Sequence, residues 1–257
     1  MKSLFLLVFL LLGLNSFAGD YRTVAVISID ALHPAAVSRK NCPNIYSILE
    51  KGVYSPDAQS TNPPKTLIAH TAMLTGMTPD ENGKMDNSWQ KSDERVQKPT
   101  MLTAAKRAGY ETVLIYSKRK LGYLGNAQTD QEIFSAEDAV DKAGAVLDTG
   151  KKQFIFLHIS GLDTIGPERG WMSADYLDEF NFIDEQLGEF FKKLSAGPSY
   201  LLVITSDHAG HDKIHGSDHP EDFKRPLAVY SSNEKLGKIP AEALKAEGLK
   251  KYIESLY

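Results

Sequence analysis

The chain lacks most of the features that stabilise or localise a protein by means other than a folded core. It has a single cysteine, Cys42, so an intrachain disulfide is excluded. It also lacks a long basic run, and its formal net charge is −4. A mildly acidic chain of this kind is a poor candidate for binding nucleic acid. We therefore expect the protein to rely on an apolar core and to present no nucleic-acid binding surface.

Long hydrophobic runs are absent as well, except at the N-terminus. Lys2 precedes an apolar run over residues 4–14, and small residues lead up to Ala18. This order is typical of an export signal. The run is too short to span a bilayer comfortably, which makes a retained membrane anchor the weaker alternative. We predict a signal peptide over residues 1–18 and an exported mature chain over residues 19–257, periplasmic or extracellular, without a transmembrane segment.

The mature region contains short β-branched runs that alternate with helical patterns. The runs are almost continuously apolar, as expected for parallel strands that are covered on both faces. They occupy residues 23–30, 111–117, 153–160, 200–207 and 226–231. Between them, residues 173–194 repeat apolar side chains at helical spacing, with Ser173 as the expected N-cap. This alternation predicts one α/β domain over residues 19–257, a three-layer α/β/α sandwich with a mostly parallel sheet.

Acidic residues stand where three of these predicted strands end. Asp30 closes the first strand, Asp163 follows the third by a few residues, and Asp207 ends the fourth and precedes His208. In open α/β sheets, functional groups gather outside the carboxyl ends of the strands. Each acid alone could instead cap the next helix. Together with histidine they favour a shared metal site, because imidazole and carboxylate are common ligands of divalent cations.

The stretch after Asp207 concentrates imidazoles. Four of the seven histidines lie within twelve residues, and they are His208, His211, His215 and His219. A polar loop rich in histidine and aspartate can also be a solvated loop, so the clustering by itself leaves both interpretations open.

A hydroxyl is predicted at the start of another helix. Pro63 and Pro64 end a loop, and Thr66 opens a helical pattern that runs to Thr75. The unpaired N–H groups at a helix N-terminus attract phosphate or sulfate oxygens. The alternative interpretation is that Thr66 serves only as the N-cap of this helix.

These residues together resemble the alkaline phosphatase superfamily, in its type I phosphodiesterase and nucleotide pyrophosphatase branch. The first strand ends in Asp30, as in that family. Members of that family have a threonine followed by histidine four residues later, glycine ten residues later, and then proline and asparagine. The matching residues here are Thr66, His70, Gly76, Pro79 and Asn87. The segments FLHISGLDTIG, GWMSADYLDEFNFIDEQLG and HGSDHPEDFKRPLAVY also resemble the catalytic domain of glycosylphosphatidylinositol ethanolamine-phosphate transferases.

The resemblance implies an alkaline phosphatase-like fold and a metal-dependent hydrolase of phosphate esters. It implies that Thr66 is the nucleophile, which forms a phospho-threonine intermediate, and that Asn87 steadies a non-bridging phosphate oxygen. It further implies two divalent ions, with Zn²⁺ favoured over Mn²⁺, and a small-molecule, lipid-linked or glycan-linked phosphate ester as substrate. The implied ligands are Asp30, Thr66, Asp207 and His208 for one ion, and Asp163, His215 and a further histidine for the other.

One departure from the family pattern concerns the second ion. The family continues its third acid as Asp-x-x-Gly-His, whereas this chain has Pro167 in place of the histidine. Proline cannot ligate a metal, so the Asp163 site is expected to be weak unless His211, His219 or Glu168 replaces the missing imidazole. The alternative function is a catalytically impaired protein that binds phosphate- or glycan-containing ligands.

Overall fold

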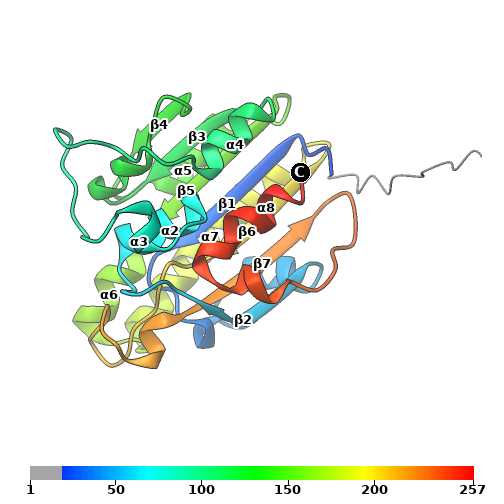
Figure 1. The fold of residues 1–257 in the computed structure, drawn as a ribbon. Helices are drawn as coiled ribbons and strands as arrows, with labels where there is room; N and C mark the ends of the chain where they lie inside the picture. Colours follow the sequence, from blue (N-terminus) through cyan, green and yellow to red (C-terminus); the bar gives the residue numbers. More distant parts are fainter. Residues whose placement is uncertain (1–18) are drawn as a thin grey trace, which may run out of the picture.

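The computed structural model describes residues 19–257, which build a seven-stranded sheet in the order β2-β7-β6-β1-β5-β3-β4 (Figure 1). The predicted signal peptide over residues 1–18 lies outside the described residues. The strands are β1 (Thr23–Ile29), β2 (Val53–Gln59), β3 (Glu111–Tyr116), β4 (Gln131–Phe134), β5 (Gln153–Ile159), β6 (Tyr200–Thr205) and β7 (Lys224–Ser231).

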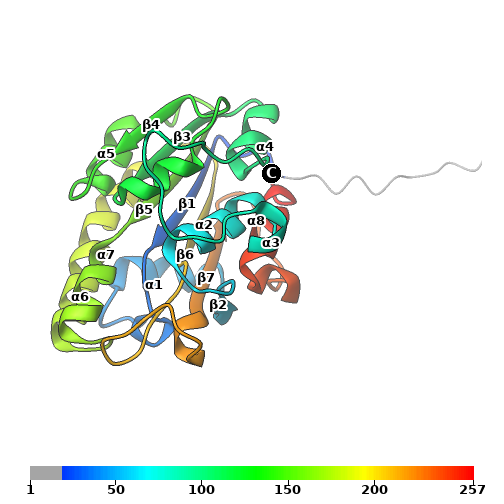
Figure 2. The ribbon, with the colours of Figure 1, turned by 60° about the vertical axis from the view of Figure 1, so that its left-hand side comes forward.

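Helices cover both faces of the sheet. The α-helices are α1 (Pro43–Leu49), α2 (Thr66–Thr75), α3 (Pro79–Asn82), α4 (Met101–Arg107), α5 (Ala139–Val146), α6 (Gly161–Arg169), α7 (Ala174–Ser195) and α8 (Leu249–Glu254). Short 3-10 helices are η1 (Pro34–Ala36), η2 (Arg119–Leu124), η3 (Pro220–Phe223), η4 (Ala241–Leu244) and η5 (Ala246–Gly248). Figure 2 shows α5, α6 and α7 on one side of the sheet, and α2, α4 and α8 on the other.

The central strand β1 shows why two layers of helices are needed. All seven of its residues are buried, and alternate side chains face opposite sides. Ala25 and Ile27 join the apolar cluster under α1, α5, α6 and α7, while Val24 and Val26 join the cluster under α2, α4 and α8. Each face buries its apolar side chains against helices, and the predicted three-layer arrangement with a mostly parallel sheet is confirmed.

The predicted long helix is observed as α7. Its N-cap is Ser173, whose hydroxyl accepts a hydrogen bond from the backbone N–H of Tyr176 at 3.2 Å. The apolar stripe includes Phe180 and Leu187, both without exposed surface. Burial of each such side chain contributes roughly 1.5–3 kcal/mol relative to leaving it in water. The stripe is therefore core packing.

Three strands differ from the sequence prediction. β7 is antiparallel to β6, although it was predicted as a parallel strand, because the chain returns directly from the carboxyl edge of β6 without a crossover helix. β2 and β4 were not predicted. β2 is an edge strand that contains Pro56 and is largely exposed, and β4 has only four residues at the opposite edge. Edge strands lack the continuous apolar run that identifies buried strands.

No helix within residues 19–257 has both the length and the hydropathy required to cross a bilayer.

Candidate metal centre and active site

The carboxyl ends of three neighbouring strands, β5, β1 and β6, meet at one edge of the sheet and present the predicted acids there. Asp30 directly follows β1, and Asp207 and His208 follow β6; none of these three has exposed surface. Asp163 lies in the first turn of α6, after β5. The sequence prediction that these residues converge is consistent with this arrangement, since three parallel strands place them at the same edge.

The carboxylate of Asp207 is oriented by the backbone of the neighbouring strand end. The N–H of Ala31 donates to its Oδ1 at 3.2 Å, and the hydroxyl of Ser206 lies 3.4 Å from the same oxygen. Ala31 has a φ of 62°, which is uncommon for a residue with a side chain. Its carbonyl accepts hydrogen bonds from Trp171 and Tyr176, which hold this conformation. The result is that Oδ1 of Asp207 is paired and Oδ2 is left free to bind something else.

The carboxylate of Asp30 is held in the same one-sided way. Nε2 of His158 lies 3.0 Å from its Oδ2, and Nζ of Lys118 lies 2.6 Å from the same oxygen. The backbone N–H of Ser117 donates to Nδ1 of His158 at 3.3 Å, so the ring proton sits on Nε2 and points at Asp30. Although burial raises the pKa of Asp30, the positive charge of Lys118 and the bond from His158 lower it well below its usual range. Asp30 is therefore a carboxylate.

The ring of His208 directs one nitrogen at three acids. Its Nδ1 donates to the carbonyl of Ala209 at 2.9 Å, so Nε2 carries the lone pair in the neutral ring. Nε2 lies 3.4 Å from Oδ1 of Asp30, 3.8 Å from Oδ1 of Asp163 and 3.5 Å from Oδ2 of Asp207. Burial lowers the pKa of His208, but the three carboxylates outweigh it and raise the pKa. This arrangement favours a proton or a bound cation between His208 and the three acids.

The free atoms of these four residues form the strongest indication of a metal. Among the described residues, the buried side-chain atoms without a hydrogen-bond partner include Asp30 Oδ1, Asp163 Oδ1, Asp207 Oδ2 and His208 Nε2. A four-coordinate ion with bonds of about 2.0 to 2.2 Å holds its ligand atoms about 3.3 to 3.6 Å apart. The separations around His208 Nε2 are close to this spacing, so the residues present fit a divalent cation.

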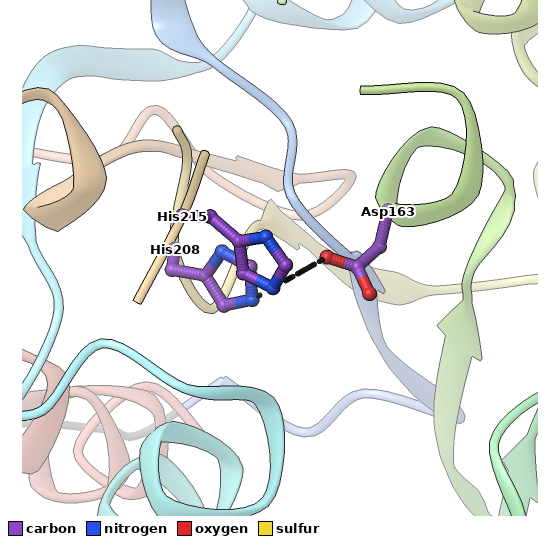
Figure 3. A group of neighbouring side chains, drawn as sticks. All are labelled: Asp163, His208 and His215. Atoms are coloured by element: carbon purple, nitrogen blue, oxygen red, sulfur yellow. Dashed lines mark ion pairs between the residues drawn. The ribbon is translucent and has the colours of Figure 1, made fainter. Parts of the chain in front are cut away.

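His215 comes from the loop after β6 and approaches Asp163 (Figure 3). Its Nε2 lies 3.4 Å from Oδ1 of Asp163, and its ring stacks on that of His208 with centroids 4.9 Å apart. Burial lowers the pKa of His215, which favours the neutral ring that a metal needs as ligand. Asp163, His208 and His215 place one ligand atom each within 4.8 Å of one another.

The position of the missing imidazole is occupied by Pro167, which lies one turn after Asp163 in α6. Of the three predicted substitutes, His211 and His219 lie elsewhere and form a group with Asp222, and Glu168 belongs to no group of candidate metal ligands among the described residues. Nδ1 of His211 is 2.7 Å from Oδ1 of Asp222, and the rings of His211 and His219 stack at 3.8 Å. These two histidines therefore do not complete the Asp163 site in this structure.

An unpredicted side chain, Lys118, reaches into the site from the end of β3. Its Nζ forms ion pairs with Oδ2 of Asp30 and with Oδ2 of Asp163, and it lies 3.3 Å from Oγ1 of Thr66. Its side chain is 20% exposed. Although burial opposes its charge, the carboxylates of Asp30 and Asp163 raise the pKa of Lys118. Lys118 is a fixed ammonium within the candidate centre.

Thr66 is the first residue of α2, but its hydroxyl does not cap the helix. The N-cap position is Lys65, and the backbone N–H of Leu67 is bound instead by Oδ1 of Asn87 at 2.8 Å. The prediction that Thr66 could be only an N-cap is therefore wrong. Nζ of Lys120 also donates to Oδ1 of Asn87, at 3.2 Å. These two bonds fix the amide with its NH₂ group available as a donor beside Thr66.

His70 fastens the start of α2 to the central strand. Its Nδ1 donates to the carbonyl of Thr66 at 2.7 Å, and its Nε2 accepts from the hydroxyl of Ser28 at 2.9 Å. Burial lowers the pKa of His70 to about 4. The ring is neutral near pH 7 and acts by holding Thr66 in place.

Sequence reasoning missed Lys118 and His158, although one signal marked both. Each lies at the carboxyl end of a predicted parallel strand, the same position that identified Asp30 and Asp207. Lysine is not a metal ligand, and His158 stands inside an apolar run that is otherwise typical of a buried strand, so neither residue type in its local context indicates the site.

Solved structures of several enzymes share this fold. A 2-O GAG sulfatase matches with a TM-score of 0.73 and 15% identity, over 92% of this chain and 70% of that one. The C-terminal periplasmic domain of EcEptC from Escherichia coli, in complex with Zn, matches with a TM-score of 0.67 and 15% identity, over 93% and 83%. Murine ectonucleotide pyrophosphatase / phosphodiesterase 5 matches with a TM-score of 0.59 and 18% identity, over 72% and 57%. These likenesses establish an alkaline phosphatase-like and sulfatase-like fold.

Sequence comparison narrows the relationship. GPI ethanolamine phosphate transferase 1 of Yarrowia lipolytica is 29% identical over 119 residues, which are 42% of this chain and 13% of that protein. Its counterpart in Neurospora crassa is 32% identical over 103 residues, which are 38% of this chain and 10% of that protein. The match thus spans only a small part of these relatives. The family model for type I phosphodiesterase / nucleotide pyrophosphatase matches residues 24–247. The chain belongs to the type I phosphodiesterase / nucleotide pyrophosphatase family.

Proposed function

We propose that the protein cleaves phosphate esters in a metal-dependent reaction with Thr66 as the nucleophile. The family and its relatives support a phosphoester-related activity. The observation that carries the finer assignment is the hydroxyl of Thr66, which has no capping role and contacts Lys118, the same ammonium that pairs with Asp30 and Asp163. A binding protein has little need for such a hydroxyl.

Asp30, Asp207 and His208 would hold the metal, because their free atoms converge and their other polar atoms are already paired. A divalent cation at this place supplies positive charge that lowers the pKa of a neighbouring hydroxyl and stabilises a phosphate oxyanion. Zn²⁺ suits the mixed imidazole and carboxylate ligands, and Mn²⁺ is the alternative. The side chains of Asp30 and Asp207 are kept in place by bonds to their second oxygens.

The proposed reaction proceeds in two displacements. Oγ1 of Thr66 loses its proton and forms a bond to phosphorus, while the bond from phosphorus to the departing alcohol oxygen breaks and that oxygen takes up a proton. Water then attacks the phospho-threonine, which releases phosphate or a phosphomonoester and restores the Thr66 hydroxyl. The NH₂ group of Asn87, whose oxygen already accepts from Leu67 and Lys120, would donate to a non-bridging oxygen in both steps.

A cavity on this side of the molecule is a candidate site for the departing group. This cavity of about 600 Å³ is lined by residues close in sequence to Asn87 and Lys118. The lining combines aromatic rings with charged side chains, and it includes Trp89, Tyr116, Phe134, Arg119 and the ion pair between Arg95 and Glu132. This composition suits the organic part of a small-molecule, lipid-linked or glycan-linked phosphate ester.

Two other outcomes have support of their own. The relatives in fungi are named as transferases, which favours an acceptor alcohol in place of water in the second displacement. Pro167 supports a protein that binds a phosphate- or glycan-containing ligand without turning it over. Export is part of the proposal too, and the E. coli structure with this fold is a periplasmic domain. Mass spectrometry of the cell-derived protein tests export, since an intact Met1 would contradict it.

The experiment that tests the nucleophile compares Thr66→Ala with Thr75→Ala in the same helix. Purified protein is assayed with nitrophenyl phosphate mono- and diesters in the presence of Zn²⁺ or Mn²⁺. We expect turnover and a phosphorylated Thr66 peptide after rapid quenching in the wild type, and neither in Thr66→Ala. The hydroxyl of Thr75 donates to the carbonyl of Thr71 and has no contact with the proposed site, so Thr75→Ala is the matched control. Turnover that survives Thr66→Ala would refute the nucleophile, and a wild type without turnover would favour the binding protein.

A further inference from the structure

We infer that this centre holds one metal ion, and that the ammonium of Lys118 takes the place of the second ion that the family resemblance implies. This inference rests on the proposed function for its catalytic meaning, but it concerns the composition of the site. It is based on the two oxygens of each carboxylate near Lys118. One oxygen pairs with the lysine, and the other is available to a metal.

This pairing is visible in Asp30 and Asp163. Oδ2 of Asp30 and Oδ2 of Asp163 both pair with Nζ of Lys118. Oδ1 of each residue has no hydrogen-bond partner among the described residues and faces Nε2 of His208, at 3.4 Å and 3.8 Å. Oδ2 of Asp207 completes the group. Asp30, Asp207 and His208 form one group of ligand atoms, whereas Asp163 and His215 form a second group only by sharing His208 with the first. Because the one free nitrogen of His208 binds a single ion, a second ion would retain only Asp163 and His215 as ligands, and the other oxygens of Asp30 and Asp163 are paired with the ammonium.

The charges of the centre lead to the same result. Asp30, Asp163 and Asp207 carry three negative charges when ionised. One divalent cation and one ammonium balance them. Two divalent cations together with the ammonium would leave an excess of positive charge among side chains that are largely buried, where repulsion between like charges is less screened than in water.

In this arrangement Lys118 compensates for the metal ligand that is lost at Pro167. Pro167 removes one imidazole from the ligands that a second ion would use, and Lys118 supplies positive charge between the same carboxylates. A lysine needs no third ligand, because its ammonium donates hydrogen bonds to Asp163 and Thr66 and forms an ion pair with Asp30. The loss of the histidine is therefore compensated rather than simply harmful.

The contact with Thr66 gives Lys118 a part in the reaction. Its Nζ lies 3.3 Å from Oγ1, the atom proposed to attack phosphorus. A fixed ammonium at this distance stabilises negative charge that develops on the hydroxyl oxygen as the proton leaves. Lys118 is thereby assigned both as the resident cation of the centre and as a catalytic residue of the proposed reaction.

The test measures metal stoichiometry. Metal-free protein carrying His219→Ala, which removes a ligand from the separate group with His211 and Asp222, is titrated with Zn²⁺ by calorimetry and analysed for bound metal after dialysis. In this background we expect one ion per chain with Lys118 present. Lys118→Met should admit a second ion, because Oδ2 of Asp30 and Oδ2 of Asp163 become free. Lys118→Arg, which keeps the charge, should retain one ion.

Lys120→Met is the matched control, since Lys120 is two residues away and bonds to Asn87 rather than to a metal-type ligand; it should bind one ion. Two ions bound with Lys118 present, or one ion bound by Lys118→Met, would overturn the inference. The outcome is separate from that of the proposed function. A chain with one ion and no turnover keeps the inference and loses the function, whereas turnover with two ions does the reverse.

Discussion

Two groups of histidine and aspartate lie at the same edge of the sheet, and they differ in how their polar atoms are paired. In the group of Asp30, Asp207 and His208, one atom of each side chain is bound by the protein and the other is free. In the group of His211, His219 and Asp222, both carboxylate oxygens of Asp222 have hydrogen-bond partners. Nδ1 of His211 lies 2.7 Å from one oxygen of Asp222, and the N–H and hydroxyl of Ser217 donate to the other oxygen.

The difference shows which property identifies a metal site. Both groups have the ligand types and spacing that a divalent cation needs. Only in the first do buried atoms remain without a partner, at a cost in free energy that a cation would remove. The second group already satisfies its acid internally and closes the loop between β6 and η3. Proximity of ligands is thus a weaker criterion than unpaired ligand atoms.

Replacing a ligand of the first group should have the largest effect. Asp207→Asn keeps the bond from Ala31 but removes a negative charge and an anionic ligand atom, so we expect Zn²⁺ affinity to fall by about 100-fold or more. Calorimetric titration of metal-free protein measures the affinity. The matched variant is Asp222→Asn, which should keep Zn²⁺ affinity but lower the free energy of unfolding by about 1–3 kcal/mol, because buried donors lose their acceptor. Equal losses of Zn²⁺ affinity in the two variants would contradict the distinction between the two groups.

The next effect concerns Pro167 and sharpens the comparison within the first group. Pro167→His alone should change metal stoichiometry little, because Lys118 still occupies the carboxylate oxygens. The double variant Pro167→His with Lys118→Met should bind a second ion more tightly than Lys118→Met does, since it adds an imidazole ligand. The increase is expected to be about 10- to 100-fold in affinity. A gain from Pro167→His that is as large with Lys118 present as without it would contradict the role of Lys118.

Removing the metal should have a moderate effect on stability. At a free concentration one hundred times the dissociation constant, a ligand that binds only the folded chain contributes about 2.7 kcal/mol. For a domain of this size we expect chelation to lower Tm by roughly 5 to 10 °C. Differential scanning calorimetry with and without chelator measures the shift. The shift should vanish in Asp207→Asn, and its persistence there would place the metal elsewhere.

The smallest effect is expected from His219→Ala. His219 is exposed, and its Nδ1 accepts only a long bond from the N–H of Glu221 at 3.3 Å. We expect a loss of less than about 1 kcal/mol in the free energy of unfolding and no change in tight Zn²⁺ binding. A clear drop in bound metal would show that the second group is a metal site despite its internal pairing.

The sequence allowed much of the fold to be predicted, since buried parallel strands have apolar runs that are visible locally. The prediction was accurate for β1, β3, β5 and β6, and for α2 from Thr66 to Thr75. The direction of β7 and the edge strands β2 and β4 depend on pairing between distant segments, which periodicity does not report. Pro56 within β2 further obscures the strand pattern.

For the site, the sequence indicated which residues gather but not how they pair. Asp30, Asp163 and Asp207 were placed together because parallel strands end at a common edge. Which oxygen of each acid remains free depends on donors such as the N–H of Ala31 and the ring of His158, which come from other segments. The ion pairs of Lys118 with Asp30 and Asp163 likewise join segments that are distant in the sequence. Its basic neighbourhood in the sequence, at residues 117–120, gave no indication of a buried ion pair.

The central claim is that the free atoms of Asp30, Asp207 and His208 bind one ion while Lys118 holds Oδ2 of Asp30 and Oδ2 of Asp163. The most direct measurement is a crystal structure of the Zn²⁺-loaded protein with anomalous diffraction data collected on both sides of the zinc absorption edge. We predict one anomalous peak at this edge of the sheet, within bonding distance of His208 Nε2, with Nζ of Lys118 still paired to Asp30 and Asp163. Two peaks in the centre, with Lys118 turned away from the carboxylates, would contradict the account.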